Sequence, residues 1–339
     1  MKRRRVLALV REGLMPPDSL EGVPEREISR WKMEYDVLQA LESLGHEVTC
    51  VEVVDELRRI REALEEVKPH IVFNMLEDFH GVVAFDANVV AYLELMRMPF
   101  TGCNSRGLVL SRDKALTKKI CVYHRLPAPP FAVFPRGQKV RRPARLGFPL
   151  IVKSLNEDAS AGISQASIVE TDEQLVRRVA FVHDHIVDDA IAERFIEGRE
   201  VYIGVLGNQR AQLFPPWELL LGGLPAGSAR IATESVKFDL GYQERYDIRS
   251  DAAQDLPPGS ADRMRKVARR LFRHLGMNGY ARFDFRVTDE GEVYVLEGNA
   301  NPDLAHDEDF AKAALAAGLA YDQLIHKVLT LGLRWHSTR

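Results

Sequence analysis

The 339-residue chain contains few cysteines and no long hydrophobic segment. Its three cysteines, Cys50, Cys103 and Cys121, are widely spaced and odd in number. This spacing argues against a disulfide framework or a zinc site and favours a reducing compartment. No apolar run approaches the ~20 residues of a membrane span, and the run Val6–Val10 is too short for the apolar part of a signal peptide. These absences predict a cytoplasmic protein without a membrane partner.

The chain also lacks an excess of charge of either sign. It holds 46 lysines and arginines against 49 aspartates and glutamates, a formal net charge of −3. This balance gives no general electrostatic reason to bind nucleic acid. Hydrophobic residues make up 46% and charged residues 28%, as is usual for globular proteins. The length suffices for two or three domains with a substantial core.

Strand and helix patterns alternate along residues 1–102, which we predict to be the first domain. The expected strands and helices are, in order, 5–10, 25–44, 48–54, 55–67, 71–75 and 82–96. Strands that alternate with helices in this way predict a doubly wound parallel sheet with helices on both faces.

Two further domains of mixed α+β type are expected. In residues 103–190 we predict a helix at 111–125, strands at 148–154 and 164–170, and a helix capped by Thr171. Residues 191–339 favour an antiparallel sheet, with strands at 191–196 and 200–206, a helix at 261–275, a hairpin at 279–299 and two C-terminal helices.

The hairpin carries the strongest chemical pattern. Segments 281–285 and 293–299 have strand-like composition, and turn-forming residues 288–292 join them. Pairing these strands brings together three oxygen-bearing side chains, those of Asp284, Glu297 and Asn299. Two carboxylates and one amide oxygen are the ligand type that Mg²⁺ prefers. We therefore predict a phosphate-handling site, with Arg282 beside the metal.

Three lysines are weaker candidates for contacts with phosphate. Lys153 ends an apolar strand, and the small, polar residues 154–163 behind it would let backbone N–H groups approach phosphate oxygens. Lys237 is placed to reach a transferred phosphate. Lys114 follows Asp113 at a helix start, where aspartate is favoured by the helix dipole without any function. Taken singly, lysines of this kind are usually no more than solvated surface residues.

Two carboxylates in segment 190–200 suit a nucleoside. Glu193, inside an apolar strand, could accept a hydrogen bond from an exocyclic amine or a ribose, and the alternative is an edge-strand charge facing water. Glu200 could hold a ribose hydroxyl. Its alternative is a cross-strand ion pair with Arg194 or Arg199.

In combination these segments resemble the ATP-grasp superfamily, and most closely its D-alanine–D-alanine ligase branch. The resemblance runs from about Pro99 to the C-terminus and is vaguer in the first hundred residues. It rests on an ordered set: Asp113-Lys114, Pro149-Leu-Ile-Val-Lys153, the small-residue loop ending at Gly162, Glu193-Arg-Phe-Ile-Glu-Gly-Arg-Glu200, Lys237, Arg282-Phe-Asp284 and Glu297-Gly-Asn-Ala-Asn-Pro302.

The resemblance implies three domains, with ATP held between the second and the third. The implied ATP contacts are Lys114, Lys153, Ser160, Gly162, Glu193, Phe195, Ile196, Glu200 and Lys237. Asp284, Glu297 and Asn299 are the implied ligands of two Mg²⁺ ions, with Mn²⁺ as the alternative metal. The implied catalytic groups are Arg282, Lys237 and Lys153.

The implied reaction is ATP-dependent ligation of a carboxylate and an amine. It passes through an acyl phosphate and releases ADP and phosphate, and Arg282 would stabilise the oxyanion. The partners would be amino acids or short peptides, and ligases of this kind are often homodimers. The narrower alternative is D-alanine–D-alanine ligase itself. A second alternative is a catalytically inactive ATP-binding scaffold protein, which would have no need for the metal cluster.

The chain departs from dipeptide ligases around both expected substrate sites. Those enzymes follow the metal motif with Pro-Gly-Met and a serine for the acceptor carboxylate, whereas this chain has Asp303 in place of the glycine and Glu308 in place of the serine. Together with Asp307 and Asp309, these acids predict an acceptor bearing an amine or guanidinium. The alternative is an acidic helix start. Glu25 stands where the family orients the donor, whose identity stays open.

Overall fold

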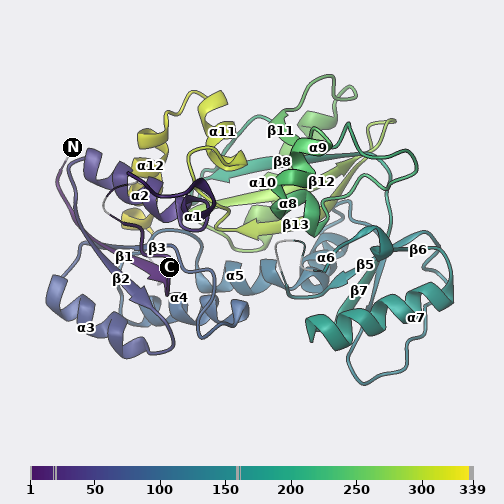
Figure 1. The fold of residues 1–339 in the computed structure, drawn as a ribbon, viewed down its shortest axis with the longest axis horizontal. Helices are drawn as coiled ribbons and strands as arrows, with labels where there is room; N and C mark the ends of the chain where they lie inside the picture. Colours follow the sequence, from purple (N-terminus) through teal and green to yellow (C-terminus); the bar gives the residue numbers. More distant parts are fainter. Residues whose placement is uncertain (1, 18, 20, 158–159, 161, 336–339) are drawn as a thin grey trace.

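The structure is a computed structural model that describes residues 2–17, 19, 21–157, 160 and 162–335, without the side chains of Glu25 and Arg26. These residues form three sheets (Figure 1) with strand orders β2-β1-β3, β4-β7-β5-β6 and β11-β10-β8-β12-β13, and β9 pairs with β8 beside the third. The first sheet is parallel, and the strand pairs in the other two are antiparallel. No helix in the described residues is long and apolar enough to cross a membrane.

The N-terminal sheet has helices on both faces, as predicted. Alternate side chains of β1 explain this: Leu7 and Leu9 pack toward α3 and α4, whereas Val6 and Ala8 pack toward α2 and α12. The elements are β1 (Arg5–Arg11), α1 (Glu25–Ile28), α2 (Lys32–Ser43), β2 (Glu47–Val53), α3 (Leu57–Val67), β3 (Ile71–Asn74), the 3₁₀ turn η1 (Val83–Phe85) and α4 (Asp86–Leu95). The single helix predicted over 25–44 is wrong, because Trp31 leaves helical geometry and starts α2 afresh.

The central part contains α5 (Ser105–Arg112), α6 (Lys114–Tyr123), β4 (Phe131–Phe134), β5 (Leu150–Ser154), η2 (Gln165–Ser167), β6 (Ile168–Val169), α7 (Asp172–Phe181), η3 (Val182–Ile186) and β7 (Ala190–Arg194). Asp113 interrupts the helix predicted over 111–125, because its side chain accepts a hydrogen bond from Leu116 N (2.8 Å) and caps α6. Strand β7 pairs with both β4 and β5. We therefore propose that the domain boundary predicted at residue 190 lies after Arg194.

The C-terminal part contains β8 (Arg199–Leu206), β9 (Gln212–Leu213), β10 (Trp217–Leu220), α8 (Glu234–Phe238), α9 (Leu240–Arg245), β11 (Arg249–Ala252), α10 (Ser260–His274), β12 (Tyr280–Val287), β13 (Val293–Ala300), α11 (Asp309–Ala316) and α12 (Tyr321–Arg334). The predicted hairpin is confirmed as β12 and β13. Helix α12 returns to the N-terminal sheet and lies beside α2, far from it in sequence (Figure 1).

The two faces of the C-terminal sheet have different roles. Phe283 and Phe285 of β12 are fully buried and belong to the same core cluster as the apolar side of α10. Because side chains alternate along a strand, Arg282, Asp284 and Arg286 point to the opposite face. That face is turned toward the central sheet and carries the chemistry described below.

We expect Phe283→Ala to lower the free energy of unfolding by about 3–5 kcal/mol, because it removes a fully buried aromatic ring from this core. Urea unfolding of the two proteins gives the difference. The matched control is Phe238→Ala, since the Phe238 side chain is 63% exposed. Equal losses in the two variants would contradict the assignment of Phe283 to the core.

Candidate active site

A cavity lies between the central sheet and the polar face of the C-terminal sheet. Most of the predicted site residues line it together: Lys114, Lys153, Ser160, Glu193, Phe195, Ile196, Glu200, Lys237, Asp284 and Glu297. They come from segments almost two hundred residues apart in sequence. The cavity therefore gathers the basic and acidic groups that the sequence placed in separate motifs.

The predicted metal ligands converge at one end of this cavity. Asp284 pairs with Glu297 across the hairpin, and Asn299 Nδ2 donates to Asp284 Oδ2 (3.2 Å) and Glu297 Oε1 (3.5 Å). The strand register shifts after Asp284, which marks a β-bulge at Leu296. A bulge of this kind redirects the side chain beside it, here that of Glu297.

The donor set fits a divalent cation. In the part of the chain that the structure describes, no group of three or more His, Cys, Asp or Glu side chains has metal-binding geometry, so the amide of Asn299 is needed to complete this set. Carboxylate and amide oxygens are hard donors of the kind that bind Mg²⁺. Asp284 is buried and Glu297 is half-buried, and charge in such surroundings calls for a cation close by.

The two carboxyl groups differ in their electrostatic surroundings. Burial raises the pKa of Asp284 above its usual value, although Arg282 opposes the rise. Burial acts on Glu297 in the same direction, but Lys114, Lys153 and Lys237 outweigh it and lower the pKa of this carboxyl. Of the two carboxyl groups, Glu297 therefore stays ionised to the lower pH.

Arg282 lies directly beside the predicted metal ligands. Its Nε and Nη2 donate to Asp284 at 2.8 and 2.9 Å, and its guanidinium lies over the ring of Tyr202, 4.5 Å from the ring centre. Burial lowers the pKa of the guanidinium, but Asp284 outweighs this effect and raises it. A permanent, planar cation is thus fixed next to the two carboxylates.

Glu193 is the acid on which two lysines converge. Its carboxylate lies 3.0 Å from Lys118 Nζ and 3.2 Å from Lys153 Nζ. The alternative of an edge-strand charge facing water is wrong, because β7 has strands on both sides and Glu193 is fully buried. Sequence reasoning missed Lys118. The signal available was its position four residues after Lys114, on the same face of a helix.

Lys118 also ties the central helix to the metal-ligand strand. It donates to the carbonyl oxygens of Val295 (3.3 Å) and Leu296 (2.9 Å), at the bulge. Burial lowers its pKa despite Glu193. For Lys153, burial is outweighed by three carboxylates, and its pKa is raised. Lys153 therefore keeps its proton, and its positive charge, to a higher pH than Lys118 does.

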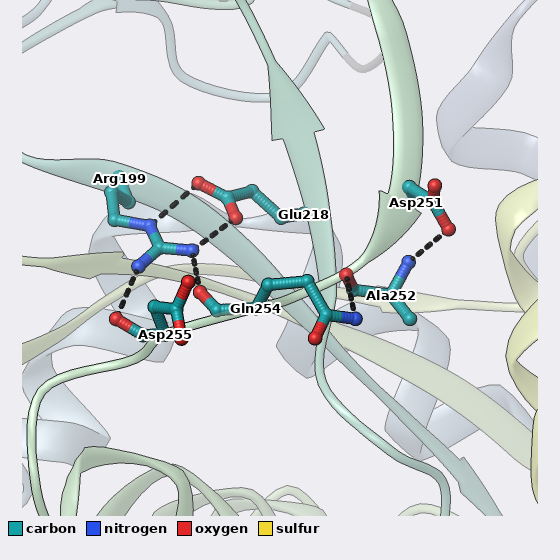
Figure 2. Close-up of polar contacts among 6 residues, drawn as sticks. All are labelled: Arg199, Glu218, Asp251, Ala252, Gln254 and Asp255. Atoms are coloured by element: carbon teal, nitrogen blue, oxygen red, sulfur yellow. Dashed lines mark hydrogen bonds and ion pairs between the residues drawn. The ribbon is translucent and has the colours of Figure 1, made fainter.

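Glu200 forms its side-chain hydrogen bonds with Arg286 and Tyr202. Arg286 Nη2 donates to it at 3.0 Å and Tyr202 Oη at 3.2 Å, so the predicted alternative of a pair with Arg194 or Arg199 is wrong. Figure 2 shows why Arg199 is not free for this role: it contacts Glu218 on β10 (Nε, 2.7 Å) and the backbone carbonyls of Gln254 and Asp255. The strand alternation sends Glu200 into the cavity and Arg199 away from it.

The loop that follows β5 is held to the opposite side of the cavity by hydrogen bonds. Gly162 N donates to Glu234 Oε2 (3.2 Å), and Glu234 N donates to the carbonyl of Ile163 (3.1 Å). Gln165 and the backbone of Ala229 exchange two further hydrogen bonds, of 3.0 and 2.8 Å. Glu234 opens the helix that carries Lys237. The loop and this lysine are therefore held together above the cavity.

The four acids predicted to recognise the acceptor do not line this cavity. Asp307 forms an ion pair with Lys32 (3.3 Å), Asp309 accepts a hydrogen bond from Ser250, and Asp303 accepts one from Ala305 N (2.7 Å). Glu308 is the N-cap residue of α11, but its side chain accepts no capping hydrogen bond. The side chain of Glu25 lies outside the described residues.

Residues 122–330, more than half of the chain, match a family model described as the D-ala D-ala ligase C-terminus. The chain belongs to the D-alanine–D-alanine ligase family. The resemblance drawn from the ordered motifs is thereby confirmed, and with it the enzyme class, a ligase that forms C–N bonds.

Relatives of this family match over most of the chain. A D-alanine–D-alanine ligase of Syntrophotalea carbinolica is 33% identical over 310 residues, which cover 90% of this chain and 91% of that protein. An uncharacterised protein, y4sG, of Sinorhizobium fredii is 30% identical over 303 residues, 88% and 86% of the two chains. The crystal structure of the Bacillus anthracis D-alanine–D-alanine ligase complexed with ATP aligns with a TM-score of 0.75 and 20% identity, covering 98% of each chain. This likeness confirms the predicted fold class.

We expect Lys118→Met to lower the free energy of unfolding by about 3–5 kcal/mol, because it leaves Glu193 buried with half of its compensating charge. Lys119→Met is the matched control, since the next side chain along the helix is exposed and its loss should cost no more than about 0.5 kcal/mol. Urea unfolding measures both. Adding Glu193→Gln to Lys118→Met should recover part of the loss, and a double variant less stable than Lys118→Met alone would contradict the pairing.

Proposed function

We propose that this member of the D-alanine–D-alanine ligase family joins a carboxylate to an amine at the expense of ATP, releasing ADP and phosphate. The single observation that carries the proposal is the cavity in which Lys114, Lys153 and Lys237 face Asp284 and Glu297. Cations for phosphate oxygens and oxygen donors for a metal meet there, as phosphoryl transfer requires.

The cavity suits a nucleoside triphosphate along its whole length. The hydrophobic side chains of Phe195 and Ile196 would enclose the adenine, and Glu200 would accept from the ribose. Lys114, Lys153 and Lys237 would neutralise phosphate oxygens. The ATP bound to the Bacillus anthracis ligase supports this assignment. When bound by Asp284, Glu297 and Asn299, Mg²⁺ would neutralise charge on the phosphates.

The residues around the cavity fit activation of a carboxylate. A carboxylate resists attack by an amine at neutral pH, but an acyl phosphate formed from it does not. Arg282 is positioned to stabilise the oxyanion that forms when the amine adds to the acyl carbon. The loop fastened by Glu234 would keep out water, which otherwise hydrolyses the acyl phosphate.

For the acceptor, we propose an amine substrate that bears a second positive group, recognised by Glu308. Of the four acids after the metal motif, this is the one whose side chain has no hydrogen-bond or ion-pair partner among the described residues. Reduced solvation beside these acids, then repulsion by Asp303 and Asp309, raises the pKa of Glu308 above its usual value, although the residue lies exposed at the surface. A cationic substrate group would relieve that repulsion.

D-alanine–D-alanine ligase activity is the second candidate, favoured by the names of relatives about 30% identical. A catalytically inactive scaffold is the third, and the intact metal-ligand set argues against it. ADP release measured with pooled amino acids and peptides separates the three. We further propose a cytoplasmic enzyme and a homodimer, the assembly that such ligases often adopt.

We expect Glu297→Gln to lower ADP formation by at least about a hundredfold, because a divalent ion supplies several kcal/mol of charge stabilisation in the transition state. A coupled assay of ADP release measures it, and circular dichroism checks the fold. Glu290→Gln, in the exposed turn of the same hairpin, is the control and should keep wild-type activity. Wild-type turnover by Glu297→Gln would refute the metal assignment.

We expect Glu308→Ser to weaken the preference for cationic over anionic acceptors by about tenfold, because a hydrogen bond to a charged group contributes roughly 1.5–3 kcal/mol. The ratio of kcat/KM values for a dibasic and an acidic amino-acid acceptor measures this preference. Glu65→Ser, on the exposed side of α3, serves as the control. An unchanged ratio in Glu308→Ser would remove the proposed role and leave the ligase reaction itself intact.

A further inference from the structure

Arg286 lines the end of the cavity that is proposed to hold the nucleoside. It stands on β12 directly opposite Glu200 of β8. Tyr202, two residues further along β8, shares the face of Glu200, because side chains alternate along a strand. All three side chains are buried. The sheet therefore places a guanidinium and a phenol beside the carboxylate that is proposed to meet the ribose.

Both oxygens of the Glu200 carboxylate accept a hydrogen bond from the sheet. Arg286 Nη2 donates to Oε2 (3.0 Å), and Tyr202 Oη donates to Oε1 (3.2 Å). Burial, and then the charge of Glu200, raise the pKa of Tyr202, so its hydroxyl stays protonated and acts as the donor. Two donors on different oxygens fix the plane of the carboxylate. Each oxygen has a second lone pair, which leaves acceptor capacity for a ligand in the cavity.

The same guanidinium holds the segment that joins the central and C-terminal sheets. Its Nη1 donates to the carbonyl oxygen of Gly198 (3.1 Å), shortly after the cavity-lining residues Phe195 and Ile196. Gly198 has a φ of +142°, and a Cβ there would collide with the carbonyl oxygen of Val287. Glycine therefore allows this segment to approach β12 closely. The side chains proposed to enclose the adenine are thus tied to the strand that carries Arg286.

A further hydrogen bond reaches the segment before α8. Nη1 of Arg286 also donates to the carbonyl oxygen of Arg230 (2.9 Å), and the next two residues, Ile231 and Ala232, line the cavity. Helix α8, which carries Lys237, begins directly after them. The planar fork of an arginine can serve several acceptors at once. One buried side chain of β12 therefore contacts three of the segments that surround the nucleoside end.

We propose that Arg286 is a positioning residue for nucleotide recognition, which fixes Glu200 toward the ribose and makes the site select nucleotides by a ribose hydroxyl. This inference rests on the function proposed above, because it takes the cavity as the ATP site. A carboxylate that is already fixed loses less conformational entropy when a ligand binds. A nucleotide without the hydroxyl forfeits a hydrogen bond to a charged acceptor, which sets the discrimination.

The test measures binding rather than turnover, so the identities of the carboxylate and amine substrates do not enter. Isothermal titration calorimetry of the full chain, with Mg²⁺ present, compares ADP with 2′-deoxy-ADP and 3′-deoxy-ADP. We expect one of the two deoxy nucleotides to bind at least about tenfold more weakly than ADP, because it lacks the hydroxyl that donates to Glu200. The nucleotide that is penalised identifies that hydroxyl.

Variants of the three side chains test the route through Glu200. Arg286→Met removes the guanidinium, so the ratio of the deoxy-ADP and ADP dissociation constants should fall below about threefold. Glu200→Ala should abolish the discrimination, and adding Arg286→Met to it should change the ratio no further. Arg286→Lys keeps the charge and should retain part of the ratio. Tyr202→Phe should lower the ratio too, and it provides the test if Arg286→Met does not fold.

Arg199→Met is the matched control. Arg199 also pairs with a carboxylate on a neighbouring strand, that of Glu218 (Figure 2), but strand alternation sends it away from the cavity. Urea unfolding should show a loss of stability in this variant, whereas its ratio of dissociation constants should equal that of the wild type. A purely structural role of Arg286 would give the same result as Arg199→Met, lower stability with an unchanged ratio.

The inference is overturned if Arg286→Met and Tyr202→Phe both keep the wild-type ratio. It is equally overturned if the wild type binds ADP and both deoxy nucleotides alike, or if Arg199→Met loses the discrimination as well. Each of these results leaves the proposed ligase reaction intact. Failure of the wild-type chain to bind ADP at all would instead overturn the proposed function together with this inference.

Discussion

The active site depends on charge compensation between side chains that are removed from water. A carboxylate or ammonium group buried alone costs several kcal/mol, and a pair persists only where partners and hydrogen bonds are complete. Glu193 meets this condition through Lys118 and Lys153, and Glu297 through the electrostatic field of the neighbouring lysines. Such a network keeps charges oriented before any ligand arrives, which is the arrangement that stabilises a transition state most effectively.

Helix α6 connects this network to the fold. Its first residue, Lys114, donates to the carbonyl of Glu157 (2.5 Å) in the loop after β5, and Lys118, one turn later, reaches the bulge of the β12–β13 hairpin. Asp113 sets the start of the helix and therefore the direction of both lysines. A residue that looked like an ordinary helix cap thus directs one lysine toward the loop after β5 and another toward the β12–β13 hairpin.

Local patterns predicted the parts of the site that a single hairpin builds. Asp284, Glu297 and Asn299 are brought together by neighbouring strands and a short turn, so alternation along each strand was sufficient to group them. The partner of Glu200 could not be found in this way, because Arg286 belongs to a strand more than eighty residues away. Lys118 was missed because a lysine on a helix normally faces water, and its burial becomes visible only once the central and C-terminal sheets enclose it.

The sequence by itself determined the strands, the family and the kinds of chemical group available, because periodicity and ordered motifs are local properties of the chain. The tertiary structure alone decided which charges are compensated and which are not. Solvent exposure and pairing depend on segments that meet only after folding. For this reason the lysine pair on Glu193 emerges from packing, although each of these residues is visible in the sequence.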